Sequence, residues 1–239
     1  MNIQPNITIN GVNSLSIQGL MITELPPITK APKRVLIEAI DGKDGDTITD
    51  LGYSAYDKPL KIALVGAFDI DSIIKFFDSE GVITFSNEPD KYYRFTIYEQ
   101  IDFARLLRFK TAEINIHVQP FKFSTLEEPI EFDVGASPNE VSVFNAGNTI
   151  SKPTITITGS GDLVLSINGV ELLNISLDAL GETIIIDTEE MNAYAENGAF
   201  LNRQVIGNYD NIKLITGENS IVITGTITAL AISKYSRWL

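Results

Sequence analysis

The segment most like a metal-binding loop is Asp41-Gly42-Lys43-Asp44-Gly45-Asp46. Hard cations bind carboxylate oxygens, but an EF-hand loop needs acids at its first, third and fifth positions, then Gly, and a closing Glu, between two helices. The spacing of the acids here does not fit that pattern, and no helix is predicted on either side. Because Gly and Asp also dominate turns, we predict a solvated turn and no metal site.

Two other places could carry chemistry by residue type. Gly159-Ser160-Gly161 lacks the Gly-Lys-Ser/Thr ending of a phosphate-binding loop and stands between predicted strands, so it is interpreted as a hairpin turn. His117, the only histidine, lies on the polar face of a predicted strand, and the sequence identifies no positioned partner for it. We predict an ordinary surface histidine.

Paired carboxylates and basic-aromatic segments are also present. A glycosidase needs two carboxyls about 5–9.5 Å apart across a cleft, which neighbours in sequence do not establish. The aromatic segments follow strand alternation, which favours a place in the core over a groove for single-stranded nucleic acid. The sequence thus predicts no catalytic, cofactor-binding or metal-binding residue, and no enzyme. The segments are Asp69/Asp71, Glu127/Glu128, Glu189/Glu190, Tyr92-Tyr93-Arg94-Phe95 and Phe121-Lys122-Phe123.

Composition narrows the function classes further. The 239 residues include 31 acids, 18 bases and no Cys, for a net charge of −13. The absence of Cys excludes disulfides, thiolate zinc sites and cysteine nucleophiles. The acidity argues against nucleic-acid binding, which needs an excess of Lys and Arg to neutralise phosphates. No apolar run approaches the ~18–20 residues of a membrane span, and no secretory signal is visible, so we expect an acidic, soluble globular protein.

Period-two alternation of apolar residues predicts a mainly β chain. It is clearest in residues 112–119, where every second residue is apolar, and Asn168-Gly169 predicts a type I′ hairpin. Four further segments have the same pattern with β-branched enrichment: residues 154–158, 163–167, 183–187 and 221–228.

One helix is predicted with a clear amphipathic pattern. Ile70, Ile73, Ile74 and Phe77 follow i, i+3, i+4, i+7 spacing, with Asp69 or Asp71 as the N-cap and Gly81 after the end. Phe77 is therefore expected in the core. A second candidate helix, residues 188–195, is short and is also compatible with a turn.

A domain boundary is predicted near residues 125–140, where Pro and Gly punctuate the chain. Residues 1–130 carry 18 acids and 13 bases, whereas residues 131–239 carry 13 acids and only 5 bases. We therefore expect two β domains, residues 1–130 with the helix and residues 131–239.

An ordered series of short motifs resembles the distal tail protein (Dit) family of phages with long, non-contractile tails, and covers nearly the whole chain. No single motif is specific, but their order is. They are Asp41-Gly42-Lys43-Asp44-Gly45, Leu51-Gly52-Tyr53, Glu80-Gly81, Pro89-Asp90-Lys91-Tyr92-Tyr93, Gln119-Pro120-Phe121-Lys122-Phe123, Asn145-Ala146-Gly147-Asn148, Ser151-Lys152-Pro153-Thr154-Ile155, Gly159-Ser160-Gly161, Asn168-Gly169, Ile186-Asp187, Gly217-Glu218-Asn219-Ser220 and Arg237-Trp238.

The resemblance implies a fold and a role. Residues 1–130 are expected to be a tail-tube-like β domain that builds a hexameric ring, and residues 131–239 a galectin-like β-sandwich, in the minimal form without a carbohydrate-binding insertion. The ring is the hub at the virion tail tip, assembled in the host cytoplasm. One ring face meets the tail tube protein and the other the tail-associated fibre/lysin protein, with baseplate or receptor-binding proteins as further candidate neighbours. DNA passes through the ring without specific binding, and no cofactor or membrane is involved.

Two alternatives remain from other function classes. The second domain could bind a host-surface saccharide, although the only tryptophan, Trp238, lies next to the end of the chain, which weakens the case for an exposed aromatic platform. The third hypothesis is a hydrolase that degrades cell-wall polymer.

Overall fold

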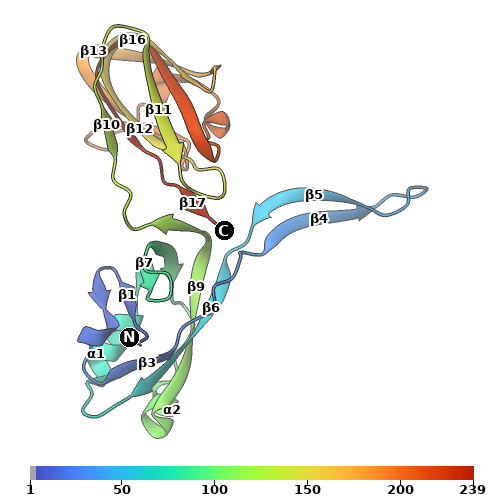
Figure 1. The fold of residues 1–239 in the computed structure, drawn as a ribbon, viewed down its shortest axis with the longest axis vertical. Helices are drawn as coiled ribbons and strands as arrows, with labels where there is room; N and C mark the ends of the chain where they lie inside the picture. Colours follow the sequence, from blue (N-terminus) through green and yellow to red (C-terminus); the bar gives the residue numbers. More distant parts are fainter. Residues whose placement is uncertain (1–3) are drawn as a thin grey trace. The chain divides into compact units, whose positions relative to one another are not determined.

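The computed structural model describes residues 4–239, which form two compact units divided between Thr125 and Leu126. Unit 1 is the part up to Thr125 together with Leu239, and unit 2 is Leu126–Trp238. Both units are built mainly from β-strands, as the sequence predicts (Figure 1). Neither of the two α-helices in the described residues is long enough to cross a membrane.

Seven strands of unit 1 form one antiparallel sheet in the order β2-β1-β7-β8-β9-β6-β3. The strands β4 and β5 pair only with each other, as a separate two-stranded ribbon. The elements of unit 1 are β1 Ile7–Ile9, β2 Val12–Asn13, β3 Leu20–Glu24, β4 Lys33–Ala39, β5 Asp46–Tyr53, β6 Tyr56–Leu64, α1 Ile70–Phe77, β7 Glu80–Phe85, β8 Lys91–Thr96, α2 Phe103–Phe109, β9 Thr111–Ser124 and the 3₁₀ turn Ser14–Ser16.

Helix α1 forms where the sequence predicts it. Asp69 is the N-cap, and its Oδ1 accepts a hydrogen bond from the backbone N–H of Asp71 at 3.1 Å. Ile73 and Phe77 are fully buried, so the apolar stripe faces the core of unit 1. Gly81 lies after the end of the helix, as predicted, but it is not the cap: the helix ends at Phe77 with Asp78 as its C-cap, and Gly81 belongs to β7.

The backbone conformation of Gly81 and the side chain of Asn10 beside it both favour glycine at this position. The Asn10 side chain donates to the carbonyl of Glu80 at 2.8 Å and accepts from the N–H of Val82 at 2.9 Å. A Cβ on residue 81 would stand 2.3 Å from Asn10 Oδ1, and its φ of +127° also favours glycine.

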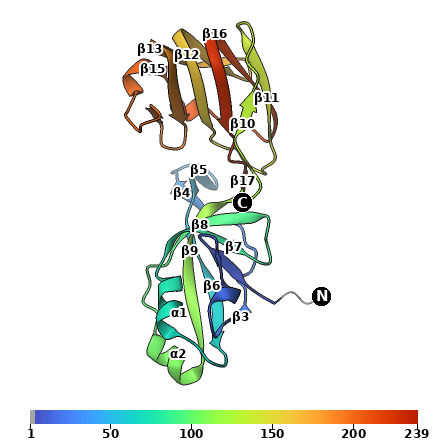
Figure 2. The same cartoon turned by 90° about the vertical axis from the view of Figure 1, so that its left-hand side faces the viewer.

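A second helix, α2, is not predicted from the sequence patterns. Its seven residues are too few for a convincing periodicity, but its capping is regular. The Asp102 carboxylate accepts from the N–H of Arg105 at 2.8 Å, Leu106 is fully buried, and Lys110 ends the helix in a left-handed conformation. The helix packs against β9 and β6 (Figure 2).

Unit 2 is a sheet of long strands that closes over a single core. Its main path is β10-β16-β12-β13-β14, with β11 also on β16 and β15 also on β13. The bounds are β10 Ile130–Phe132, β11 Asn139–Asn145, β12 Thr154–Ile167, β13 Val170–Asp187, β14 Asn192–Tyr194, β15 Val205–Gly207, β16 Gly217–Ser233, β17 Arg237–Trp238 and the 3₁₀ turns Asn202–Gln204 and Tyr209–Asn211.

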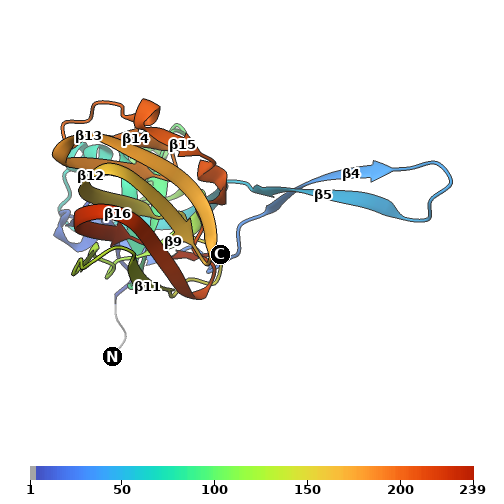
Figure 3. The same cartoon turned by 90° about the horizontal axis from the view of Figure 1, so that it is seen from above.

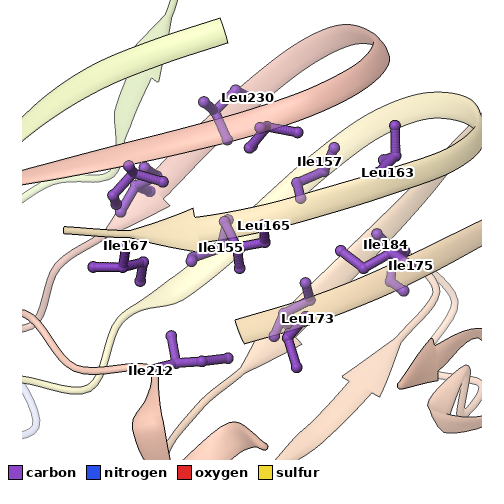
Figure 4. Packing of buried hydrophobic residues seen from close by; sticks show 14 of the residues in the cluster. Ile155, Ile157, Leu163, Leu165, Ile167, Leu173, Ile175, Ile184, Ile212 and Leu230 are labelled. Atoms are coloured by element: carbon purple, nitrogen blue, oxygen red, sulfur yellow. The ribbon is translucent and has the colours of Figure 1, made fainter. Parts of the chain in front are cut away.

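The core of unit 2 is aliphatic, and both halves of each long strand contribute to it. In β12, Ile155 and Ile157 from the first half and Leu165 and Ile167 from the second half belong to the same buried cluster (Figure 4). The predicted strands 154–158 and 163–167 are therefore two halves of one strand.

The prediction of a hairpin turn at Gly159-Ser160-Gly161 is wrong, because these residues lie inside β12. The pairing register of β12 shifts here against both β13 and β16, so the glycines mark a bend. A Cβ on Gly159 would lie 2.4 Å from the carbonyl oxygen of Thr226, and Gly161 has a φ of +72°. The hairpin at Asn168-Gly169 is confirmed, with φ values of +51° and +79°.

The second candidate helix at residues 188–195 is also resolved, in favour of a turn followed by β14. The Asp187 carboxylate accepts from the N–H groups of Glu189 and Glu190, both at 2.9 Å, which closes the turn. Thr188 is buried and donates its hydroxyl to the Pro153 carbonyl at 2.7 Å.

We expect Phe77→Ala to lower the melting temperature of unit 1 and to leave that of unit 2 nearly unchanged. Truncation of a buried phenylalanine typically costs ~3–5 kcal/mol, and Phe77 packs in the core of unit 1 only. Calorimetry of the full chain measures both transitions. Tyr98→Ala is the control, because that side chain is 63% exposed. Two transitions that fall together in Phe77→Ala would contradict the independence of the units.

Candidate assembly surface

The β4–β5 ribbon is the most unusual surface of unit 1. It extends away from the seven-stranded sheet (Figure 3), and every residue from Lys33 to Asp46 is exposed. A two-stranded hairpin without a covering layer is marginally stable in water. Six large aliphatic residues of this ribbon nevertheless have exposed fractions between 39% and 65%: Val35, Leu36, Ile37, Ile40, Ile48 and Leu51.

The strand register gathers aliphatic side chains and carboxylates on one face of the ribbon. Ile37 pairs with Ile48, Ala39 with Asp46, and Val35 with Asp50, so these side chains share a face. Ile37 and Ile48 are 57% and 65% exposed. An apolar surface bordered by charge is typical of a site where another protein binds.

The metal-like segment, residues 41–46, is the connection between β4 and β5. Gly42 and Gly45 have φ values of +83° and +78°, and the N–H of Lys43 donates to the carbonyl of Ile40 at 3.0 Å. The segment is wholly exposed, which confirms the predicted solvated turn. Among the described residues, no group of three or more metal-capable side chains comes together.

His117 has a partner that the sequence does not reveal. Asp57 stands opposite it in the β6–β9 register, and its Oδ1 lies 2.7 Å from His117 Nδ1. The rings of Tyr98 and His117 also meet in a T-shaped arrangement, with 5.2 Å between their centroids. Within residues 4–239, His117 makes no hydrogen bond to a hydroxyl, so the pair does not extend into a nucleophilic triad.

Unit 1 also buries an ionic cluster, the kind of group in which perturbed titration often marks a functional site. Glu88 accepts hydrogen bonds from Lys122 Nζ at 2.9 Å and from the hydroxyl of Tyr93 at 2.8 Å. Lys58 is 2% exposed, donates to the carbonyl of Pro27 at 2.9 Å, and lies 5.0 Å from the centre of the Tyr93 ring. Each charged group of the cluster thus has a partner, and the cluster fastens β6, β8 and β9 together.

Burial lowers the pKa of Lys58 to about 8, and the nearby Lys122 acts in the same direction while Glu88 opposes it. Burial and the Glu88 carboxylate raise the pKa of the Tyr93 hydroxyl, which stays protonated. Lys58 is hydrogen-bonded to a backbone carbonyl, and Glu88 to Tyr93 and Lys122, so we interpret the cluster as structural.

The outer surface of α2 is a second feature that the sequence patterns miss. Arg105, Arg108 and Phe109 lie on one face of the helix, and all three are exposed. The available signal was Asp102 followed by apolar residues at 103, 106 and 107, a short capped helix.

Two antiparallel β units, the first carrying a free ribbon, define the fold class, and solved structures share it. No protein-family model and no curated protein sequence matches the chain. The chain is similar to SPP1 Dit (gp 19.1), described as a paradigm of the hub adsorption apparatus in phages that infect Gram-positive hosts. The TM-score is 0.68 at 18% identity, over 97% of this chain and 99% of that one. The resemblance to the Dit family is thus confirmed at the level of the fold.

Two structures of the phage p2 baseplate in its activated conformation also match. The one with Sr has a TM-score of 0.45 at 9% identity, over 97% of this chain and 98% of that one. The one with Ca has a TM-score of 0.41 at 8% identity, over 93% and 98%. Scores of this size do not bear on the fold.

We expect the melting temperature of unit 1 to rise between pH 7.5 and 9.5. The unfolded chain holds a proton on Lys58 up to about pH 10.4, whereas the folded chain releases it near pH 8, so the unfolding free energy increases with pH in this window. Above about pH 10 the raised pKa of Tyr93 gives the opposite sign, because the unfolded chain then loses protons first.

The Lys58→Met variant should lose this rise, whatever its absolute stability, and calorimetry across the pH series measures it. Lys61→Met is the matched control, since Lys61 is on the same strand but is exposed, and Glu24 raises its pKa. A rise that persists unchanged in Lys58→Met would disprove the assignment.

Proposed function

We propose that the chain is a structural subunit of a phage tail, a distal tail hub protein that forms a hexameric ring at the tail tip. The observation that carries this proposal is the fold similarity to SPP1 Dit over 97% of the chain, which includes both units. The ordered series of Dit-like motifs in the sequence supports it independently.

In this proposal unit 1 builds the ring and unit 2 is the galectin-like domain. One ring face binds the tail tube protein, and the other binds the tail-associated fibre/lysin protein, with baseplate or receptor-binding proteins as further neighbours. Assembly takes place in the host cytoplasm. The exposed aliphatic ribbon supports an assembly role, because a surface of this kind is stabilised when another subunit covers it.

The proposal assigns no catalysis and no specific nucleic-acid binding. Among the described residues, no hydroxyl is hydrogen-bonded to His117 of the His117–Asp57 pair, which favours a structural contact. At −13 per chain, a hexameric ring carries about −78, and an acidic lumen repels DNA phosphates and leaves the genome free to pass. Only charges within about 8 Å of the passing DNA act on it at physiological salt.

A saccharide-binding role of unit 2 is the second candidate, and one groove favours it. The groove has a volume of about 440 Å³ and runs along β10, β16 and β12. Thr156, Thr158 and Thr228 and the segment Glu131–Asp133 line it, and residues with hydroxyl and carboxylate groups can form hydrogen bonds to sugar hydroxyls.

A glycan array with the full chain tests this second candidate. Binding that disappears in the Thr156→Val/Thr228→Val variant would establish the groove as a saccharide site. If no glycan on the array is bound at protein concentrations where the ring forms, saccharide binding is excluded and only the structural role remains.

We expect the wild-type chain to reach a mass near 158 kDa at high protein concentration, six copies of 26.3 kDa. The Ile37→Ser/Ile48→Ser variant should stay folded and require at least about a hundredfold higher concentration to assemble, since each buried isoleucine contributes ~1.5–3 kcal/mol. Light scattering coupled to size exclusion measures both masses.

The matched control is Val170→Ser/Ile206→Ser in unit 2, which removes two side chains that are 58% and 72% exposed. It should assemble like the wild type. A wild-type chain that stays monomeric at millimolar concentration would overturn the ring assembly, and an unaffected ribbon variant would remove the ribbon from it.

A further inference from the structure

The exposed surface of α2 carries positive charge that no carboxylate of residues 4–239 neutralises in a salt bridge. Residues 103–110 contain Arg105, Arg108 and Lys110 and no acid. In the part of the chain that the structure describes, neither arginine forms an ion pair with a carboxylate. The guanidinium of Arg108 lies 5.2 Å from the centre of the Phe109 ring, and Leu107 and Phe109 are 40% and 59% exposed. The surface is therefore basic and apolar together.

A groove of about 590 Å³ lies beside this surface. Arg105 and Phe109 of α2 line it, together with Lys61 of β6. Two carboxylates, Asp102 and Glu113, also line it, and Asp102 is engaged as the N-cap of α2. The groove gives a ligand room to lie against the arginine and the phenylalanine.

The β4–β5 ribbon has the complementary chemistry. Residues 33–53 contain five carboxylates and three bases, and two of those bases, Lys33 and Arg34, stand at the start of β4, so residues 38–50 contain five carboxylates and one lysine. Glu38, Asp41, Asp44 and Asp46 form no ion pair within residues 4–239, and the exposed isoleucines 37 and 48 share a face with Asp46. An acidic aliphatic ribbon and a basic apolar helix surface attract each other electrostatically and also bury apolar area on contact.

The two surfaces lie at opposite ends of one strand, so they do not meet within a chain. The ribbon ends at Tyr53, immediately before β6 begins at Tyr56. The C-terminal end of α2 is fixed at the other end of β6, where the N–H of Leu64 donates to the carbonyl of Lys110 at 2.8 Å. The nine residues of β6 separate them by roughly 26 Å. Figure 1 shows the ribbon leading away from α2.

We propose that the β4–β5 ribbon of one copy docks on α2 and the adjoining groove of the next copy, which rests on the proposed ring assembly. Because the donor and acceptor surfaces differ, a pair of copies keeps one free surface of each kind after one contact: the α2 surface of the copy that gave its ribbon and the ribbon of the other copy. Repetition of this contact closes a ring when the rotation fits.

Charge reversal on the full chain tests the contact. The Asp44→Lys/Asp46→Lys variant and the Arg105→Glu/Arg108→Glu variant should each need about tenfold or more higher concentration to assemble, since like charges then face each other. The chain with all four substitutions restores opposite charges and should assemble like the wild type. An equimolar mixture of the two double variants should also assemble. Sedimentation velocity at low ionic strength follows all four samples.

Lys75→Glu on the exposed face of α1 is the matched control and should leave assembly unchanged. Double variants that dissociate but are rescued neither by combination nor by mixing would overturn the docking of the ribbon on α2. A wild-type oligomer that tolerates both reversals would do the same and leave the ring intact. A wild-type chain without any oligomer at low ionic strength would instead overturn the ring assembly itself.

Discussion

The antiparallel pairing of β6 is the interaction on which unit 1 depends. β6 pairs with β9 along eight of its residues and with β3 on the other side, and Leu60 and Ile62 are fully buried. Lys58 of the same strand reaches into the aromatic cluster of Tyr93 and Phe85. Because the ribbon precedes β6 and α2 is fastened to its far end, the register of this one strand also sets the distance between the two exposed surfaces.

Unit 2 depends on a different constraint, the passage of long strands through a bend without loss of pairing. β12 and β16 approach so closely there that Gly159 and Gly225 leave no room for a Cβ, against the carbonyls of Thr226 and Asp162 respectively. The aliphatic side chains on either side of the bend then fill one core. In a strand of alternating isoleucine, leucine and valine, the apolar side chains on both sides of the bend face the same core only if the alternation is shifted at the bend. The register shifts of β12 against β13 and β16 provide that change.

The sequence could predict those features whose signal is local. The stripe that buries Phe77, the alternation that buries Tyr93 and Phe95, and the Asn168-Gly169 turn are all set by neighbours along the chain. Features that depend on residues far apart in the chain could not be predicted from the sequence. Gly159 is read as a turn because the glycine signature of a bend and of a hairpin is the same, and only the partner strand distinguishes them. The alternation of residues along β9 predicts Lys122 on the surface, but the side chain is only 6% exposed. The pairing of β8 with β9 brings Glu88, 34 residues earlier in the chain, within hydrogen-bond distance of it.

The same reasoning applies to the ribbon. Its polar turn can be predicted from the sequence, but the absence of a covering layer over its aliphatic side chains cannot. An exposed aliphatic edge invites indiscriminate pairing between chains, and charged side chains on it are one way proteins limit that. The carboxylates of residues 38–46, on a chain of net charge −13, repel a second acidic ribbon and admit only a basic surface. In unit 1 the exposed surface around Arg105 and Arg108 meets that requirement. In the proposed contact, the charges of the ribbon thus select the partner surface, and the aliphatic side chains stabilise the contact once it forms.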